Sequence, residues 1–255
     1  MTISVFNLFS IGIGPSSSHT VGPMRAAKQF ILKLENEGLL QGTKSIKADL
    51  YGSLALTGKG HGTDLAILLG LEGETPEGID PNIVQDQVAK IRAMKGLNLL
   101  KKNIISFDEK TDLLFHYDKQ LPYHPNGMRF TAYNEAGKEC YSQVYYSVGG
   151  GFIVDHEAAY KDKHLGENDH KLPYPFKTAE ELLYLGRRHQ MKFAHIMMEN
   201  EKTWRTEQDI RKGLLHIWEI MKACIDRGCH QDGILPGGLN VKRRAAGILR
   251  SAAGL

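Results

Sequence analysis

One stretch of this chain combines a tight turn with a cluster of reactive side chains: Ile11-Gly-Ile-Gly-Pro-Ser-Ser-Ser-His-Thr-Val-Gly-Pro23. An amphipathic helix is predicted to follow, because apolar residues from Met24 to Leu34 recur at helical spacing. Unsatisfied backbone N–H groups and the positive end of the helix dipole coincide at a helix start. The hydroxyls and the histidine gathered there predict a site for a small anion, such as an amino-acid carboxylate. The alternative is that Ser16–Thr20 only caps the helix at Pro23.

A second segment places a histidine between glycines: Tyr51-Gly-Ser-Leu-Ala-Leu-Thr-Gly-Lys-Gly-His-Gly-Thr-Asp64. The pattern predicts a strand that enters a glycine-rich turn and then a helix. Glycines allow close backbone approach to a ligand, and Lys59, His61 and Thr63 add a charge, a base and a hydrogen-bond donor. A flexible turn with its own N-cap is the alternative. A P-loop does not fit, because the glycine spacing is one residue too long and glycine replaces the magnesium-binding Ser or Thr.

Two further glycine-bearing segments follow: His124-Pro-Asn-Gly-Met-Arg-Phe130 and Ser147-Val-Gly-Gly-Gly-Phe-Ile153. His124 precedes a turn and is predicted at an exposed strand entry, where an incidental role is the alternative to a functional one. The triple glycine Gly149–Gly151 ends a strand and could either admit a ligand or make a domain hinge. The other histidines are expected at the surface or in a linker, including His116, His156, His164, His170 and His216.

Composition is that of an ordinary globular protein. The 255 residues are 42% apolar and 24% charged, and the net charge of +3 involves no long run of Lys or Arg, so nucleic-acid binding is not expected. The sequence shows no signal peptide and no apolar run long enough to span a bilayer, so we expect a cytoplasmic protein. Cys140, Cys224 and Cys229 form no Cys-x-x-Cys pair and are expected to be free, partly buried thiols.

The first part of the chain is predicted to form an α+β domain. Two of its strands form a hairpin through Asn134-Glu-Ala-Gly137. Helices are expected over 64–71, capped by Thr63, and over 82–94, and strands over 46–51, 112–117, 128–133 and 141–147.

Beyond residue 160 the pattern changes. A charged segment followed by Leu172-Pro-Tyr-Pro-Phe176 predicts a linker. Thr178-Ala-Glu-Glu181 is a capping box that opens a helix through His189, and Thr206 starts another helix, whose apolar stripe ends before Gly228. We therefore expect an α+β domain over 1–159, a linker over 160–175 and the incomplete start of an all-α domain over 176–255.

Together with Asp226-Arg-Gly-Cys-His-Gln-Asp-Gly-Ile-Leu-Pro-Gly-Gly-Leu-Asn-Val-Lys-Arg-Arg244, these segments resemble the bacterial iron–sulfur L-serine dehydratases, or L-serine ammonia-lyases. The resemblance implies a serine-binding α+β domain, called the β domain, and a larger helical α domain that carries a [4Fe–4S] cluster. It also implies the single-chain type of the family, a homodimer and L-serine as the substrate. The chain ends before the family's cluster cysteines. We therefore expect the cluster ligands in a missing C-terminal part and expect this chain alone to be inactive.

In that family a cluster iron acts as a Lewis acid on serine, a base removes the α-proton, hydroxide leaves, and the aminoacrylate hydrolyses to pyruvate and ammonia. The resemblance makes His61 the leading candidate for the base and His124 a second acid/base or orienting group. No residue of this chain is assigned as a metal ligand. A substrate-contacting or loop-organising role is implied for a further set of residues: Ser16, Ser17, Ser18, His19, Thr20, Lys59, Thr63 and Asn126.

Two other functions stay open. A non-catalytic serine-binding or regulatory chain that needs a partner would use the same α+β domain, although the helical extension over 176–255 argues against it. A pyridoxal-phosphate lyase with Lys59 as the Schiff base is the other, but the sequence has no second motif for that cofactor's phosphate.

Overall fold

The computed structural model describes residues 4–161, 171–235 and 240–254. Its contacts divide the chain into two compact units. The α/β unit comprises Gly12–Lys163 and Leu235–Val241, and the helical unit comprises Met1–Ile11, His164–Ile234 and Lys242–Leu255. The expected division at residues 159 and 176 stays a prediction, because residues 162–170 of the predicted linker lie outside the described residues.

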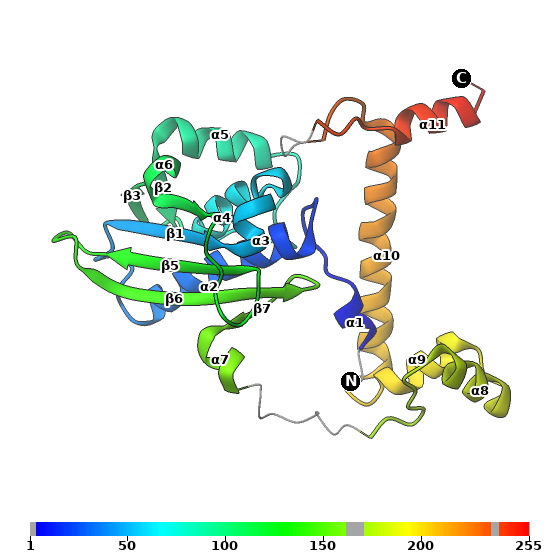
Figure 1. The fold of residues 1–255 in the computed structure, drawn as a ribbon. Helices are drawn as coiled ribbons and strands as arrows, with labels where there is room; N and C mark the ends of the chain where they lie inside the picture. The colour runs from blue at the N-terminus through cyan, green and yellow to red at the C-terminus, as the bar shows by residue number, and fades with distance from the viewer. Residues whose placement is uncertain (1–3, 162–170, 236–239, 255) are drawn as a thin grey trace. The chain divides into compact units, whose positions relative to one another are not determined.

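A five-stranded mixed sheet forms the centre of the α/β unit (Figure 1). β1 pairs with β4 in parallel, and the other neighbouring strands are antiparallel. The predicted hairpin joins β5 to β6, and the predicted α+β class is confirmed. The strand order is β4 (Leu113–His116), β1 (Ser45–Tyr51), β5 (Gly127–Tyr133), β6 (Glu139–Gly149) and β7 (Phe152–Asp155), and a separate pair consists of β2 (Gly96–Leu99) and β3 (Asn103–Ser106).

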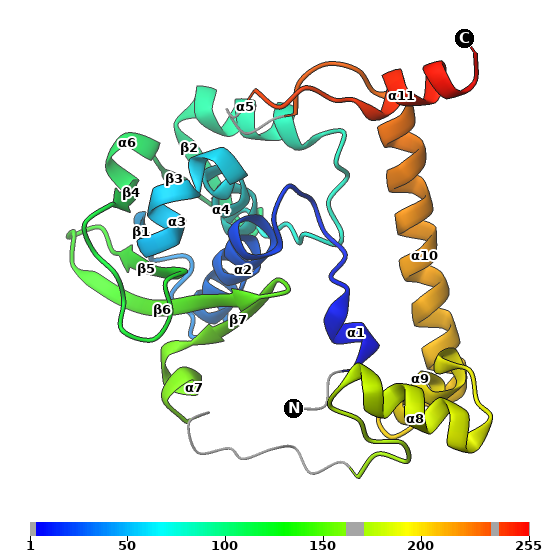
Figure 2. The ribbon, with the colours of Figure 1, turned by 45° about the vertical axis from the view of Figure 1, so that its right-hand side comes forward.

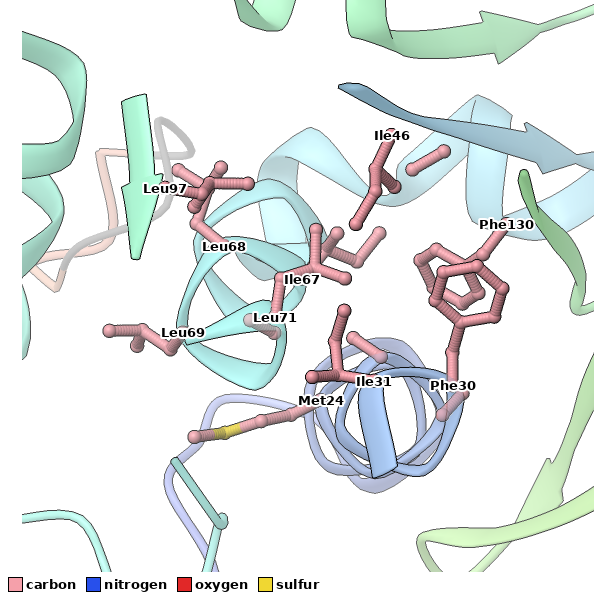
Figure 3. Close-up of a cluster of buried hydrophobic side chains, with 14 of the residues drawn as sticks. Met24, Phe30, Ile31, Ile46, Ile67, Leu68, Leu69, Leu71, Leu97 and Phe130 are labelled. Carbon is pink, nitrogen blue, oxygen red and sulfur yellow. The ribbon is translucent and has the colours of Figure 1, made fainter. Parts of the chain in front are cut away.

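Two helices of the α/β unit define its core. α2 (Gly22–Asn36) packs against α4 (Thr63–Leu71), and α2 also runs along the sheet (Figure 1, Figure 2). Large apolar side chains fill the space between them, among them Phe30, Ile67 and Phe130 (Figure 3). Burial of such a side chain contributes about 1.5–3 kcal/mol to the free energy of unfolding, so this core stabilises the packing of α2 against α4. The remaining helices of this unit are α3 (Gly52–Thr57), α5 (Val84–Met94), α6 (Glu109–Asp112) and α7 (His156–Lys161).

The predicted place of the serine cluster at a helix start is confirmed, because a π-helical turn over Ser17–Val21 leads directly into α2. The structure decides or corrects two other local predictions. Gly149–Gly151 all have positive φ and make the turn from β6 to β7 within one unit, so they are not a hinge between domains. His116 is a half-buried partner of Asp49, with 2.6 Å between Nε2 and Oδ1, and not a surface residue.

The helical unit contains α1 (Val5–Leu8), α8 (Ala179–His189), α9 (Phe193–Glu201), α10 (Glu207–His230) and α11 (Ala245–Ala252). The capping box at Thr178 and the helix start at Thr206 are confirmed. α10 continues through Gly228, because one glycine costs a helix only about 1 kcal/mol. Among the residues that the structure describes, no helix is long and apolar enough to cross a membrane.

Candidate active site

The first two glycine-rich segments meet at a pair of histidines. His19 lies in the π-helical turn before α2, and His61 ends the short 3-10 turn Lys59–His61 before α4. Their ring centroids are 5.0 Å apart, and the ring planes are tilted by 45°. Segments separated by about forty residues of sequence thus bring two imidazoles together.

Two threonines brace this pair reciprocally. Thr20 Oγ1 donates to the carbonyl oxygen of His61 at 2.7 Å, and Thr63 Oγ1 donates to the carbonyl oxygen of His19. Both threonines are fully buried. Each hydroxyl therefore fixes the backbone of the histidine on the opposite segment. Thr63 is the first residue of α4 and Gly62 is its N-cap, so the predicted capping role of Thr63 was wrong.

The hydrogen bond at His61 fixes its tautomer. His61 Nδ1 lies 2.9 Å from the carbonyl oxygen of Thr57. A carbonyl oxygen can only accept, so Nδ1 carries the proton and Nε2 keeps a lone pair. An imidazole with its tautomer set in this way can accept a proton at Nε2, as a general base requires.

His19 is held on both sides by hydroxyls. Its Nδ1 lies 2.9 Å from Ser18 Oγ, and its Nε2 lies 3.1 Å from Ser53 Oγ. Burial lowers the pKa of His19, the neighbouring His61 lowers it further, and Ser53 acts in the opposite direction. The neutral ring is therefore favoured at pH 7. Sequence reasoning did not single out Ser53, although its place directly after Gly52 was the available signal.

The segment that contains His124 packs on the start of α3. The carbonyl oxygen of Pro125 accepts the backbone N–H of Ser53 at 2.9 Å. Gly52 has a φ of +54°, and a Cβ there would lie 2.4 Å from that same oxygen, so this approach requires glycine. His124 Nδ1 accepts the backbone N–H of Asn126 at 3.1 Å, so a neutral His124 carries its proton on Nε2. Burial lowers the pKa of His124, which favours this neutral form.

Asn126 and Ser147 present unpaired polar atoms beside the first segment. Asn126 Nδ2 donates to the carbonyl oxygen of Ser147 at 3.1 Å, and the backbone N–H of Ser147 donates to Asn126 at 3.0 Å. Within the described chain, the buried atoms Asn126 Oδ1 and Ser147 Oγ make no hydrogen bond. Ser147 Oγ faces Gly22, where a Cβ would lie 2.1 Å away. Unpaired buried polar atoms are uncommon and mark candidate ligand contacts. Ser147 was not among the predicted site residues.

The remaining predicted site residues have different surroundings. Ser16 Oγ accepts the backbone N–H of His19 at 3.2 Å, so it caps the turn, whereas the exposed Ser17 has a hydroxyl without a partner in the described residues. The ammonium of Lys59 lies 5.2 Å from the ring centroid of Phe115. It lines a separate cavity of about 320 Å³ together with Asp64 and Lys110.

The described cysteines do not form a site for an iron–sulfur cluster. Cys140 Sγ, on β6, donates to the carbonyl oxygen of Ala132 at 3.3 Å. Cys224 and Cys229 lie on α10, and a separation of five residues places them on different sides of a helix. Among the described residues, no three His, Cys, Asp or Glu side chains are grouped to hold a metal ion. The thiolate set that such a cluster requires is therefore not supplied by these residues.

Comparisons with known proteins identify the family of this chain. The family model described as "Serine dehydratase beta chain" matches residues 4–158, and the model "Serine dehydratase alpha chain" matches residues 188–253. A Streptomyces coelicolor protein named "L-serine dehydratase" is 52% identical over 98% of this chain and 55% of its own length. A Haemophilus influenzae protein of that name is 43% identical over 98% of this chain and 54% of its own. The chain spans about half the length of these relatives. The resemblance stated from the motifs is confirmed: the chain belongs to the serine dehydratase family.

Proposed function

We propose that this chain carries the serine-binding and proton-transfer residues of an L-serine dehydratase, which converts L-serine to pyruvate and ammonia by β-elimination. One observation carries the proposal: the Thr57 carbonyl oxygen leaves His61 Nε2 free to accept a proton, inside a site built from three predicted motif segments. The names of the relatives support the substrate.

The two histidines suit different roles in the elimination. His61 Nε2 takes the α-proton of serine, and the released electron pair forms the Cα–Cβ double bond. The β-hydroxyl leaves as hydroxide, and the Nε2–H of His124 donates a hydrogen bond that orients the leaving oxygen. The proton held by His61 then neutralises the hydroxide to water, which returns His61 to its starting form. The aminoacrylate tautomerises to the imine, and hydrolysis gives pyruvate and ammonia.

The other residues divide into contacts and supports. We assign contacts with the serine carboxylate and hydroxyl to Ser17, Asn126 and Ser147, because Ser17 Oγ, Asn126 Oδ1 and Ser147 Oγ have no partner in the described chain. Supporting roles fall to Ser16, which caps the turn, Ser18, which orients His19, and the bracing pair Thr20 and Thr63. Lys59 stays a predicted substrate contact, although its ammonium packs on Phe115.

The proposal includes the cofactor and assembly that the resemblance implies. The described cysteines do not supply a thiolate set, so the ligands of a [4Fe–4S] cluster are expected in the part of the relatives' length that this chain does not span. A cytoplasmic homodimer is also proposed, since the free thiols Cys140, Cys224 and Cys229 suit a reducing compartment.

Titration of this chain with L-serine tests the proposed site. Histidine ring signals in NMR spectra are expected to shift for His19 and His61, with D-serine as the competitor control. His61→Ala should remove the response of the His19 ring, whereas His216→Ala, at an exposed position of α10, should leave it intact. A spectrum unchanged by saturating serine would remove the basis for the site.

A second assay separates the enzyme from the non-catalytic serine-binding alternative. We expect this chain alone to bind serine without forming pyruvate after anaerobic treatment with iron and sulfide. A stable visible absorbance together with pyruvate would show that these residues suffice for both cluster assembly and turnover.

A further inference from the structure

A buried carboxylate in the helical unit holds the N-terminal segment of the chain. Glu201, at the end of α9, is 1% exposed. Its Oε2 accepts the hydroxyl of Ser4 at 2.9 Å, and its Oε1 accepts the backbone N–H of Val5 at 2.6 Å. Arg205 Nη1 lies 3.1 Å from Oε2 and balances the charge. A buried carboxylate is stable only when paired and hydrogen-bonded, and two of these three contacts come from residues 4 and 5.

An aromatic contact next to Glu201 holds the following residue of the N-terminal segment, Phe6. The guanidinium of Arg205 lies 4.6 Å from the ring centroid of Phe6. The ring rests against α10 at Gly213, where a Cβ would lie 2.5 Å from the ring carbon Cε1. Glycine inside a helix carries a propensity cost, and here it makes room for an aromatic ring. Hydrogen bonding to Glu201 and ring packing at Gly213 therefore act on consecutive residues of one segment.

We propose that Glu201, Arg205 and Gly213 form a receptor for a peptide segment, and that its occupant is this chain's own Ser4–Leu8. The receptor recognises a serine hydroxyl, the following backbone N–H and an aromatic ring two residues after the serine. The carboxylate and guanidinium neutralise each other, so the occupant needs donors and a ring but no charge. The segment lies in the helical unit, and the α/β unit begins at Gly12.

Binding of a peptide to the full chain tests this receptor, after the chain's own Ser4–Leu8 segment has been weakened by substitution. A chain carrying Ser4→Ala and Phe6→Ala, with α-helix content verified by circular dichroism, is titrated with a fluorescent peptide of residues 1–11. Saturable binding is expected. Wild-type chain should bind at least about tenfold more weakly, because its own segment competes at an effective concentration of about 1 mM. Adding Glu201→Gln to the substituted chain should weaken binding by about 10- to 100-fold. Absence of saturable binding, or equal binding with Glu201→Gln, overturns the proposal.

A matched pair of glycine substitutions provides an independent measurement in the otherwise native chain. Gly213→Ala places a methyl group against the Phe6 ring, whereas Gly228→Ala on the same helix meets nothing within 4 Å. Both changes favour the α10 helix. Hydrogen exchange of the peptide covering residues 4–9 should become at least about tenfold faster in Gly213→Ala only. Equal exchange in both variants, or no protection of this peptide in wild type, overturns the proposal.

Discussion

The reciprocal threonine bonds lead to a quantitative prediction about the histidine pair. Thr20→Val and Thr63→Val keep the shape of each side chain but remove the hydrogen bonds to the carbonyl oxygens of His61 and His19. A buried carbonyl that loses its donor costs about 1–3 kcal/mol. Either loss frees the same two segments. The free-energy cost of the double variant should therefore be about 0.5–1 kcal/mol smaller than the summed costs of the two single variants.

Local hydrogen exchange suits this test, because two units need not unfold in one step. Opening free energies would be measured for peptides covering residues 16–22 and 58–66 in both single variants and the double variant. Thr57→Val is the matched control, since its exposed hydroxyl bonds only the carbonyl oxygen of Ser53 and should change exchange little. Strictly additive effects, or effects no larger than that of Thr57→Val, would refute the reciprocal brace.

Three further predictions concern the proposed reaction. In the active dehydratase, His61→Ala should lower pyruvate formation by about 10²–10⁴-fold, and near-normal turnover would reject His61 as the base. Ser147→Ala should weaken serine binding by about tenfold, measured by titration, whereas Ser142→Ala, whose hydroxyl bonds Thr131, should not; equal effects would remove Ser147 from the site. The pKa values of His19 and His124 are lowered, so the unfolded chain binds more protons just below pH 6.5. The free energy of unfolding of the α/β unit should therefore fall as the pH drops below about 6.5, and a flat profile in urea titrations between pH 7.5 and about 5 would contradict this.

Much of the fold followed from local patterns. The capping box at Thr178, the hairpin at Asn134–Gly137 and the helix after Pro23 were predicted because each depends on residues a few positions apart. The short strands β2 and β3 escaped prediction, since four residues carry too little periodicity to distinguish a strand from a loop. The π-helical turn was missed because its hydrogen bonds do not have a distinct sequence pattern.

The amino-acid pattern predicted which chemical groups belong to the candidate site: histidines, hydroxyls and an amide, each in a glycine-rich turn, in an order that indicated the serine dehydratase family. The contacts between those groups depend on the tertiary structure. It sets the tautomer of His61, bonds Thr20 and Thr63 to the carbonyl oxygens of the opposite segments, and places Ser53 and Ser147 beside the predicted residues. The physical reason is that hydrogen bonds across tens of residues depend on packing of the core between α2, α4 and the sheet, and no local pattern encodes that packing.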